Sequence, residues 1–536
     1  MNRRVAASPL RLLAVFAGLV AGLLPFAVAA ANPVPPTPAE DVALLAHPAL
    51  LGREAGSPQA ALASQYIAQR LRGLGLQPFE GDSYFQPVPL TRVSARVGAA
   101  ELVVQRGDAS FTAHYGKEAF VELGGVPDLG AAPLSLVFAG YGIVSATPAH
   151  DDLAGLDLKG KAVLVWNGEP QKEGGGSPFA PGRISRFTFA SIKRDLLAQR
   201  GARLVLIGTP PGATSALESF RRAQRDHERP RLVVQGSPTT PPVVYLDEAA
   251  TRRVLEVGGA DVAALWSASG LGKYAGRDLA GLTASLSLPD LASSDVVERN
   301  VVALLPGSDM KLKNEVVIVG SHFDHIGADR QPDGSWVIYP GADDNASGVA
   351  AMLAAAEALS RGNAPKRSVL FASFAAEESG ALGSAWLASH PLPAGMKPVA
   401  LVNLDMVGQN HLAREDYRNV VLASFTARST EMMAALIAGA ASAKLDLRKI
   451  PYIRPSGRSD DTPFAEKKIP AVLLFTGMHP DHDTPRDTAD NVITDKIAVI
   501  GAMAANVARQ LADAASFSWN DAMTEAPKAD NWDRPY

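Results

Sequence analysis

The second half of the chain alternates apolar runs with amphipathic stretches. The apolar runs have the length of buried strands, and they lie at residues 315–320, 368–374, 399–404 and 471–475. The other stretches repeat apolar positions with the period of a helix, and they lie at residues 348–359, 382–387, 431–443 and 495–511. Strands that alternate with helices favour an α/β domain. We therefore predict a mostly parallel central sheet flanked by helices over residues 290–516.

The first half has a different pattern. From about residue 86 to residue 288, short apolar or alternating runs are separated by turn residues, which is typical of a β-rich region. We place an inserted β-rich domain at residues 131–270, and we assign residues 41–130 to the N-terminal part of the α/β domain. Residues 58–72 are predicted to be helical, with one face formed by Leu62, Tyr66, Ile67 and Leu71.

The N-terminus has the pattern of a secretory signal peptide. Arg3 and Arg4 come before an apolar run at residues 12–28, which small residues follow. A membrane anchor is the alternative, but the run is slightly short for a span and Pro25 lies near its end. We therefore predict that residues 1–31 are cleaved, leaving a secreted or periplasmic protein without a stable membrane anchor.

Chain length, net charge and the absence of cysteine exclude several classes of protein and of metal site. A chain of 536 residues is long for one core, so we expect two or three domains, joined to the N-terminus by a proline-rich linker at residues 32–40 and ending in a polar tail at residues 517–536. A formal net charge of −4 gives no reason to expect nucleic-acid binding. The chain has no cysteine, which excludes disulfides, thiolate nucleophiles and thiolate metal ligands. Any metal ion must therefore be held by His, Asp or Glu.

Each apolar run of the second half ends on side chains that can bind a metal ion. Taken singly, these residues fit ordinary roles as helix caps or exposed polar groups. Together they would place many negative charges at the carboxyl edge of one sheet, where bound divalent cations would offset their repulsion. The side chains are His322, Asp324, His325, Asp343, Asp344, Glu377, Glu378, Asp405, His479, Asp481, His482 and Asp483.

Five motifs in this order resemble those of the co-catalytic zinc aminopeptidases. They lie at residues 322–324, 341–348, 377–378, 403–406 and 484–488. Residues 51–58 resemble the N-terminal motif of the same family, whose fold is shared with proteins like glutamate carboxypeptidase II and the transferrin receptor. The resemblance implies the zinc-exopeptidase fold and a metallo-aminopeptidase that acts on peptides or proteins. It covers about residues 41–78 and 297–511.

The resemblance also implies the ligands of two zinc ions. His322 and Asp405 are expected to hold one ion, and Glu378 the other. Asp343 is expected to bridge both ions with its two carboxylate oxygens. No motif restricts the metal to Zn²⁺, so Mn²⁺ and Co²⁺ are alternatives.

Two further carboxylates are assigned by the resemblance to work beside the metal ions. Asp324 is expected to orient His322 through its second ring nitrogen. Glu377 is expected to be the general base that takes a proton from the attacking water and delivers it to the leaving nitrogen. Adjacent glutamates can differ in this way because a loop after a strand need not direct them to the same side.

One position departs from the family pattern. The family usually has a histidine directly before Thr484-Pro485, but Asp483 stands there and His482 precedes it. Asp483 can replace the histidine as an oxygen ligand, His482 can reach the metal through a shifted loop, or the second site is weak. We favour Asp483 at this stage. His479 is expected to have a supporting role.

The β-rich middle resembles a protease-associated domain. The resemblance is carried by residues 138–143, 157–165 and 201–207, and it implies a domain that covers or shapes the substrate cleft. Two alternatives to the aminopeptidase remain at this stage. One is a non-catalytic binding protein whose metal site has decayed, and the other is a peptidase or amidase that acts on a different terminus.

Overall fold

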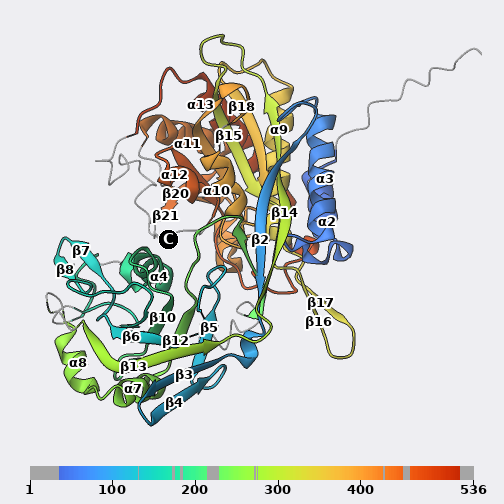
Figure 1. Cartoon of the computed structure of the whole chain (residues 1–536). Helices are drawn as coiled ribbons and strands as arrows, with labels where there is room; N and C mark the ends of the chain where they lie inside the picture. The colour runs from blue at the N-terminus through green and yellow to red at the C-terminus, as the bar shows by residue number, and fades with distance from the viewer. Residues whose placement is uncertain are drawn as a thin grey trace, which may run out of the picture. The chain divides into compact units, whose positions relative to one another are not determined.

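The computed structural model describes residues 36–130, 132–171, 175–180, 185–213, 228–270, 273, 276–390, 392–425, 429–450 and 459–519 (Figure 1). The predicted signal peptide and most of the predicted tail lie outside this range. From Thr37 onwards the chain forms one compact unit. Among the described helices, none is both long and apolar enough to cross a membrane.

A ten-stranded sheet forms the centre of the α/β region. Its strands follow the order β11-β2-β14-β18-β15-β19-β22-β20-β21, and the short β1 pairs with β14. In chain order they are β1 (Gln77–Pro78), β2 (Phe85–Ser94), β11 (Arg231–Val234), β14 (Ala292–Leu305), β15 (Glu315–His322), β18 (Ser368–Phe374), β19 (Lys397–Leu404), β20 (Val420–Phe425), β21 (Asp446–Ile450) and β22 (Ala471–Phe475).

The middle of this sheet is parallel, and so is the pair β20–β21 at one edge. Strands β18, β15, β19 and β22 pair in parallel, and they are the four apolar runs that the sequence predicted as strands. On one side β14, β2 and β11 are antiparallel, and on the other β20 is antiparallel to β22. The expectation of a mostly parallel sheet is thus correct for the centre and for the pair β20–β21, while the other strand pairs are antiparallel. Strands β2 and β11 escaped prediction because their buried positions are interrupted by partly exposed ones, so they lack a continuous apolar run.

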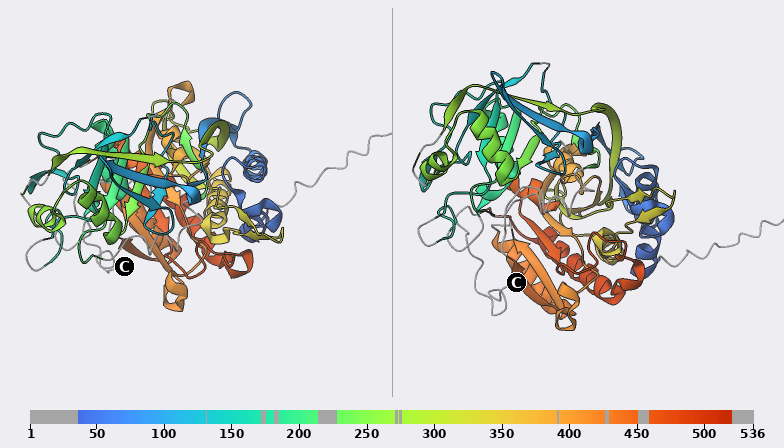
Figure 2. Two further views of the ribbon diagram at one scale, coloured as in Figure 1. Left: turned by 60° about the horizontal axis from the view of Figure 1, so that its bottom comes forward. Right: turned by 90° about the horizontal axis from the view of Figure 1, so that it is seen from below.

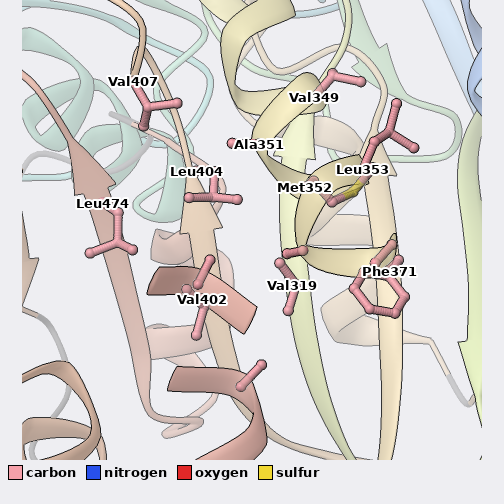
Figure 3. Close-up of a cluster of buried hydrophobic side chains, with 14 of the residues drawn as sticks. Val319, Val349, Ala351, Met352, Leu353, Phe371, Val402, Leu404, Val407 and Leu474 are labelled. Atoms are coloured by element: carbon pink, nitrogen blue, oxygen red, sulfur yellow. The ribbon is translucent and has the colours of Figure 1, made fainter. Parts of the chain in front are cut away.

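Helices cover both faces of the ten-stranded sheet. Side chains of β15 alternate between the two faces, so Val317 and Val319 belong to one core while Val316 and Ile318 belong to the other. The larger core is completed by α2 (Pro38–Leu45), α3 (Pro58–Gly73), α9 (Gly348–Ser360), α11 (Thr430–Ala443) and α13 (Thr494–Asp513), and the smaller by α10 (Leu382–Ser389) and α12 (Asp461–Glu466). Figure 3 shows Met352 and Leu353 of α9 beside Val319 of the sheet.

Two sequence expectations near the N-terminus need correction. Helix α2 begins at Pro38, inside the predicted linker, because proline suits the first turn of a helix and Thr37 forms a capping box with Glu40. Helix α3 matches the predicted helix, but Leu62 is 54% exposed. The small residues Ala60 and Ala63 occupy the buried face instead, which allows the helix to pack closely.

A second sheet has its own hydrophobic core. Its eight strands follow the order β4-β3-β13-β6-β9-β10-β12-β5 (Figures 1 and 2). The strands are β3 (Glu101–Arg106), β4 (Ala109–His114), β5 (Ala119–Glu122), β6 (Leu134–Phe138), β9 (Ala162–Trp166), β10 (Leu204–Gly208), β12 (Val243–Leu246) and β13 (Arg277–Ser287). Helices α4 (Ala190–Gln199), α7 (Glu248–Val257) and α8 (Val262–Ala268) and the hairpin of β7 (Val144–Ala146) and β8 (Ala149–Asp151) belong to the same stretch of chain.

The boundaries of this second region differ from the predicted ones. Its sheet starts at Glu101 and ends at Ser287, so it extends beyond residues 131–270 on both sides. Strand β11 lies within that stretch of sequence but pairs with β2 in the ten-stranded sheet. Pairing between strands far apart in sequence sets these limits, and local pattern does not reveal it. The resemblance to a protease-associated domain stays a prediction.

Candidate metal centre

The predicted metal-binding side chains come together where the central parallel strands end. His322 is the last residue of β15, Glu377 and Glu378 follow β18, and Asp405 follows β19. The turn Ala342–Ser347 brings two aspartates to the same edge, just before α9. The loop after β22 adds His479, His482 and Asp483. The carboxyl edge of a parallel sheet is where ligands bind in α/β proteins.

His322 is the centre of a first group of possible ligands. Its Nε2 atom lies 3.3 Å from Asp344 Oδ1 and 3.4 Å from Asp405 Oδ1. Glu377 Oε2 is 4.0 Å from the same nitrogen. The imidazole is almost fully buried, so these carboxylates are held near it in a medium of low dielectric constant.

The second oxygen of Asp344 faces a different set of side chains. Asp344 Oδ2 lies 3.3 Å from His482 Nε2 and 3.8 Å from His325 Nδ1. His325 Nδ1 is also 2.7 Å from Glu378 Oε1. One carboxylate therefore faces two groups of ligands with its two oxygens, as a residue that bridges two metal ions must.

Asp343, which the sequence assigned to that bridging position, points elsewhere. Its Oδ1 accepts a 2.6 Å hydrogen bond from the backbone N–H of Gly408, and its Oδ2 lies 3.2 Å from His479 Nε2. Asp487 accepts hydrogen bonds from the backbone N–H groups of Asp343 and Asp344 at 2.8 and 3.1 Å. The non-helical backbone at Asp344 (φ −105°, ψ 96°) turns its side chain to the centre. Asp344, and not Asp343, therefore lies between the two groups of ligands.

Asp324 links the loops after β15 and β18. Its carboxylate accepts hydrogen bonds from the backbone N–H groups of Glu377 and Glu378 at 3.0 and 3.4 Å. His322 Nδ1 lies 3.2 Å from the backbone oxygen of Asp324 and 3.9 Å from its carboxylate. Asp324 therefore positions His322 mainly through its carbonyl, and its carboxylate fixes the two glutamates.

Ser459 supports Asp405 from the start of α12. Its hydroxyl donates a 2.6 Å hydrogen bond to Asp405 Oδ2 and accepts one of 2.8 Å from Asn403. The adjacent Asp460 is fully buried, and burial raises its pKa to about 7. Ser459, Asp460 and Asp461 resemble a further loop of the zinc aminopeptidase family, although a surface turn would explain them nearly as well from sequence alone.

Arg53 holds the backbone around the centre by hydrogen bonds to carbonyl oxygens. Its buried guanidinium donates to the carbonyl oxygens of Phe323 at 2.8 Å, Pro340 at 2.6 Å and Gly341 at 2.9 Å. Burial lowers the pKa of Arg53 to about 10, which still leaves it charged at neutral pH. The arginine of the N-terminal motif at residues 51–58 thus joins the loop after β15 to the turn before α9.

The electrostatics of the centre are those of a cation site. Burial and the nearby carboxylate of Asp460 raise the pKa of Glu377 well above its ordinary value, and burial together with Asp344 does the same for Glu378. Despite its burial, His482 has its pKa raised to about 9 because Asp344 and Asp483 lie beside it. These shifts show that the carboxylates repel one another and attract positive charge.

The available donor atoms fit zinc. Three triplets of side chains offer ligand atoms within 4.8 Å of one another: His322, Asp344 and Glu378; His322, Glu377 and Asp405; and His325, Asp344 and Asp483. Imidazole nitrogens and carboxylate oxygens without thiolates are a donor set that Zn²⁺ accepts. Among the described residues, the buried His325 Nε2 also lacks a hydrogen-bond partner.

Sequence motifs did not identify His325 as a candidate ligand. It lies three residues after His322, and its side chain is fully buried. Its position directly after Asp324 in a motif already rich in ligands was the one signal available. The structure brings it to Glu378, whereas Asp483, the favoured third ligand, has a side chain that is 51% exposed.

Comparison with known proteins gives one family for this region. Residues 300–508 match Peptidase family M28. Leupeptin-inactivating enzyme 1 of Streptomyces exfoliatus is 30% identical over 203 residues, which are 37% of this chain and 40% of the relative. Leucine aminopeptidase 2 of Arthroderma otae is 29% identical over 220 residues, or 39% and 41% of the two chains. The chain thus spans about two fifths of the length of these relatives.

A solved structure matches over most of the chain. The aminopeptidase from Aneurinibacillus sp. strain AM-1 superimposes with a TM-score of 0.55 at 21% sequence identity, covering 88% of this chain and 92% of that one. At this identity the match establishes a shared fold.

Proposed function

Because residues 300–508 match Peptidase family M28, we propose that this protein is a metallo-aminopeptidase that removes N-terminal residues from peptides with the help of two zinc ions. The observation that carries the proposal is Asp344, whose two oxygens face two separate groups of ligands beside Glu377. The relatives that are named as aminopeptidases support the same reaction. With the predicted signal peptide, the enzyme would be secreted or periplasmic.

We assign the ligands from these distances. One ion would be held by His322, Asp344 and Asp405, and the other by Asp344, Glu378 and His482. Asp344 would take the bridging role that the sequence assigned to Asp343. When bound, the ions would lower the pKa of a water molecule, polarise the scissile carbonyl and stabilise the oxyanion that forms.

His482 is a better third ligand than Asp483 on geometric grounds. Its Nε2 atom faces the shared carboxylate of Asp344 at 3.3 Å, and its Nδ1 lies 3.3 Å from Asp483 Oδ2. A histidine ligand whose other nitrogen contacts a carboxylate is the usual arrangement at zinc sites, because the carboxylate orients the ring. Asp483 stands where the family usually has a histidine ligand, and it would then orient His482, the residue before it.

Glu377 is placed to move the proton. Its backbone N–H is held by Asp324 at 3.0 Å, and its side chain ends 4.0 Å from His322 Nε2. We propose that Glu377 accepts a proton from the attacking water and donates it to the nitrogen that leaves. A carboxylate within reach of the attacking water can act first as the base and then as the acid of this exchange.

Metal analysis and substrate cleavage test the proposed function. For purified residues 32–536 we expect about two zinc ions per chain and chelator-sensitive cleavage of aminoacyl-anilides. Acetylation of the substrate amine should abolish cleavage, since an aminopeptidase requires the free terminus. Cleavage of acetylated peptides would indicate a different terminus, and a metal-free, inactive protein would favour the non-catalytic binding protein.

A second experiment tests the third ligand. We expect His482→Ala to lose about one zinc equivalent per chain, while Asp483→Ala retains both ions with an affinity lower by about ten- to a hundredfold, the usual effect of removing a group that orients a ligand. Metal content after dialysis against a weak chelator measures the difference. Loss of one equivalent in Asp483→Ala with retention in His482→Ala would reverse the two roles.

A further inference from the structure

Distances between side-chain atoms separate metal ligands from hydrogen-bonded pairs at the candidate centre. Two atoms that bind one zinc ion at about 2.0–2.2 Å in a tetrahedral arrangement lie about 3.3–3.6 Å apart. His322 Nε2 is 3.3 Å from Asp344 Oδ1 and 3.4 Å from Asp405 Oδ1. His482 Nε2 is 3.3 Å from Asp344 Oδ2. These pairs therefore have the spacing that two ligands of a shared ion require.

The contact between His325 and Glu378 has a different spacing. His325 Nδ1 lies 2.7 Å from Glu378 Oε1, which is the distance of a hydrogen bond and is too short for two ligands of one tetrahedral ion. Glu378 must be ionised to bind a metal ion, and an ionised carboxylate can only accept a hydrogen bond. The hydrogen of this bond therefore belongs to Nδ1, and His325 contacts Glu378 as an N–H donor.

Close packing holds the ring of His325 in this position. Its side chain is fully buried, and its backbone N–H donates to the carbonyl oxygen of Arg53 at 3.3 Å. Gly341 lies against the ring, where an added Cβ atom would come within 2.5 Å of the imidazole Cγ. Within the described part of the chain, His325 Nε2 has no hydrogen-bond partner. A ring confined in this way, with its hydrogen bond made by Nδ1, fixes the direction from which Glu378 is held.

We propose that His325 is a positioning residue that orients the side chain of Glu378 for the second metal ion. The inference rests on the proposed two-metal peptidase. Asp324 already holds the backbone N–H of Glu378 at 3.4 Å, and His325 fixes the plane of its carboxylate. Because the hydrogen bond engages Oε1, Oε2 is left as the oxygen for the ion. Hydrogen bonds to ligating carboxylates contribute to metal affinity in this way.

Two variants of His325 that are nearly equal in size test this role. Asparagine can place an N–H group where Nδ1 lies, whereas leucine has no polar group to offer. Stepwise zinc dissociation constants of residues 32–536 are measured by competition with a chromophoric chelator. We expect His325→Leu to raise one constant by about ten- to a hundredfold, the usual effect of removing a group that orients a ligand. His325→Asn should keep both constants close to those of the wild-type protein, and the constant that rises in His325→Leu should be the one that His482→Ala abolishes.

His150→Leu is the matched control. His150 belongs to another buried histidine–carboxylate pair, in the region of the eight-stranded sheet, where its Nε2 atom lies 3.0 Å from Asp152 Oδ2. We expect this variant to lower Tm without changing either zinc constant. Circular dichroism and Tm are recorded for every variant, and His325→Ala is the substitute if His325→Leu does not fold.

The outcomes distinguish this proposal from the proposed function. If His325→Asn and His325→Leu weaken zinc binding equally, His325 is a ligand, and if neither weakens it, the hydrogen bond has no role in metal binding. Either result overturns the proposal, as does an equal effect of His150→Leu on the same constant. None of these results depends on cleavage. A wild-type protein that binds two zinc ions but cleaves no aminoacyl-anilide would refute the aminopeptidase function alone, and one with fewer than two zinc sites would refute both.

Discussion

Glu377→Gln should lower kcat by about a hundredfold or more while the protein keeps its fold and both metal ions. Glutamine has the same shape as glutamate but cannot accept a proton, and general-base catalysis typically contributes about 10²- to 10⁴-fold. Glu377 is assigned as the general base for two reasons. Its Oε2 atom lies 4.0 Å from His322 Nε2, and it is not one of the ligands proposed for the two ions. The measurement is kcat with an aminoacyl-anilide at saturating substrate, together with metal content.

Glu378→Gln is the matched control for this experiment. The two glutamates are adjacent and both are held through their backbone by Asp324, but only Glu378 is assigned as a ligand. We expect Glu378→Gln to lose metal and Glu377→Gln to retain it. Near-normal turnover in Glu377→Gln, or equal metal loss in both variants, would refute the division of roles.

Asp344→Asn should have the second large effect, with loss of at least one metal ion and a fall in activity of about a hundredfold or more, since two metal sites share its carboxylate. Replacing one oxygen by an amide nitrogen removes a ligand atom from one of the groups that Asp344 faces. Metal content and kcat are measured on the same preparation.

Asp343→Asn provides the comparison, because it is the adjacent residue that sequence motifs favoured for the same role. An asparagine keeps the oxygen that accepts the hydrogen bond from Gly408. We expect this variant to retain both metal ions, with a lower Tm as its main effect because its side chain is fully buried. If Asp343→Asn loses metal while Asp344→Asn does not, the bridging residue is Asp343 after all.

Much of the fold could be predicted from the sequence where an element has its own hydrophobic pattern. Strands β15, β18, β19 and β22 are buried on both faces, so each is a continuous apolar run, and helices α9, α11 and α13 closely match their predicted ranges. The ligand types also followed from composition, since a chain without cysteine has only nitrogen and oxygen ligands to offer. Strands β2 and β11 have no such local pattern, because their buried positions are interrupted by partly exposed ones.

The tertiary structure decided which of the candidate side chains meet. Spacing could not choose between Asp343 and Asp344, because adjacent residues differ in direction according to backbone dihedral angles that Asp487 and Arg53 help to set. For the same reason, spacing could not decide whether His482 or Asp483 is the third ligand. His325 entered the centre through its contacts with Asp344 and with Glu378, which is 53 residues away.

The place of β11 depended on tertiary structure altogether. It lies within the stretch of sequence that forms the eight-stranded sheet, but it pairs with β2 of the ten-stranded sheet. The sequence alone determined the local elements and the types of ligand, since these depend on residue type and period. Which side chains face one another depends on strand pairing and backbone direction, which only the folded chain defines.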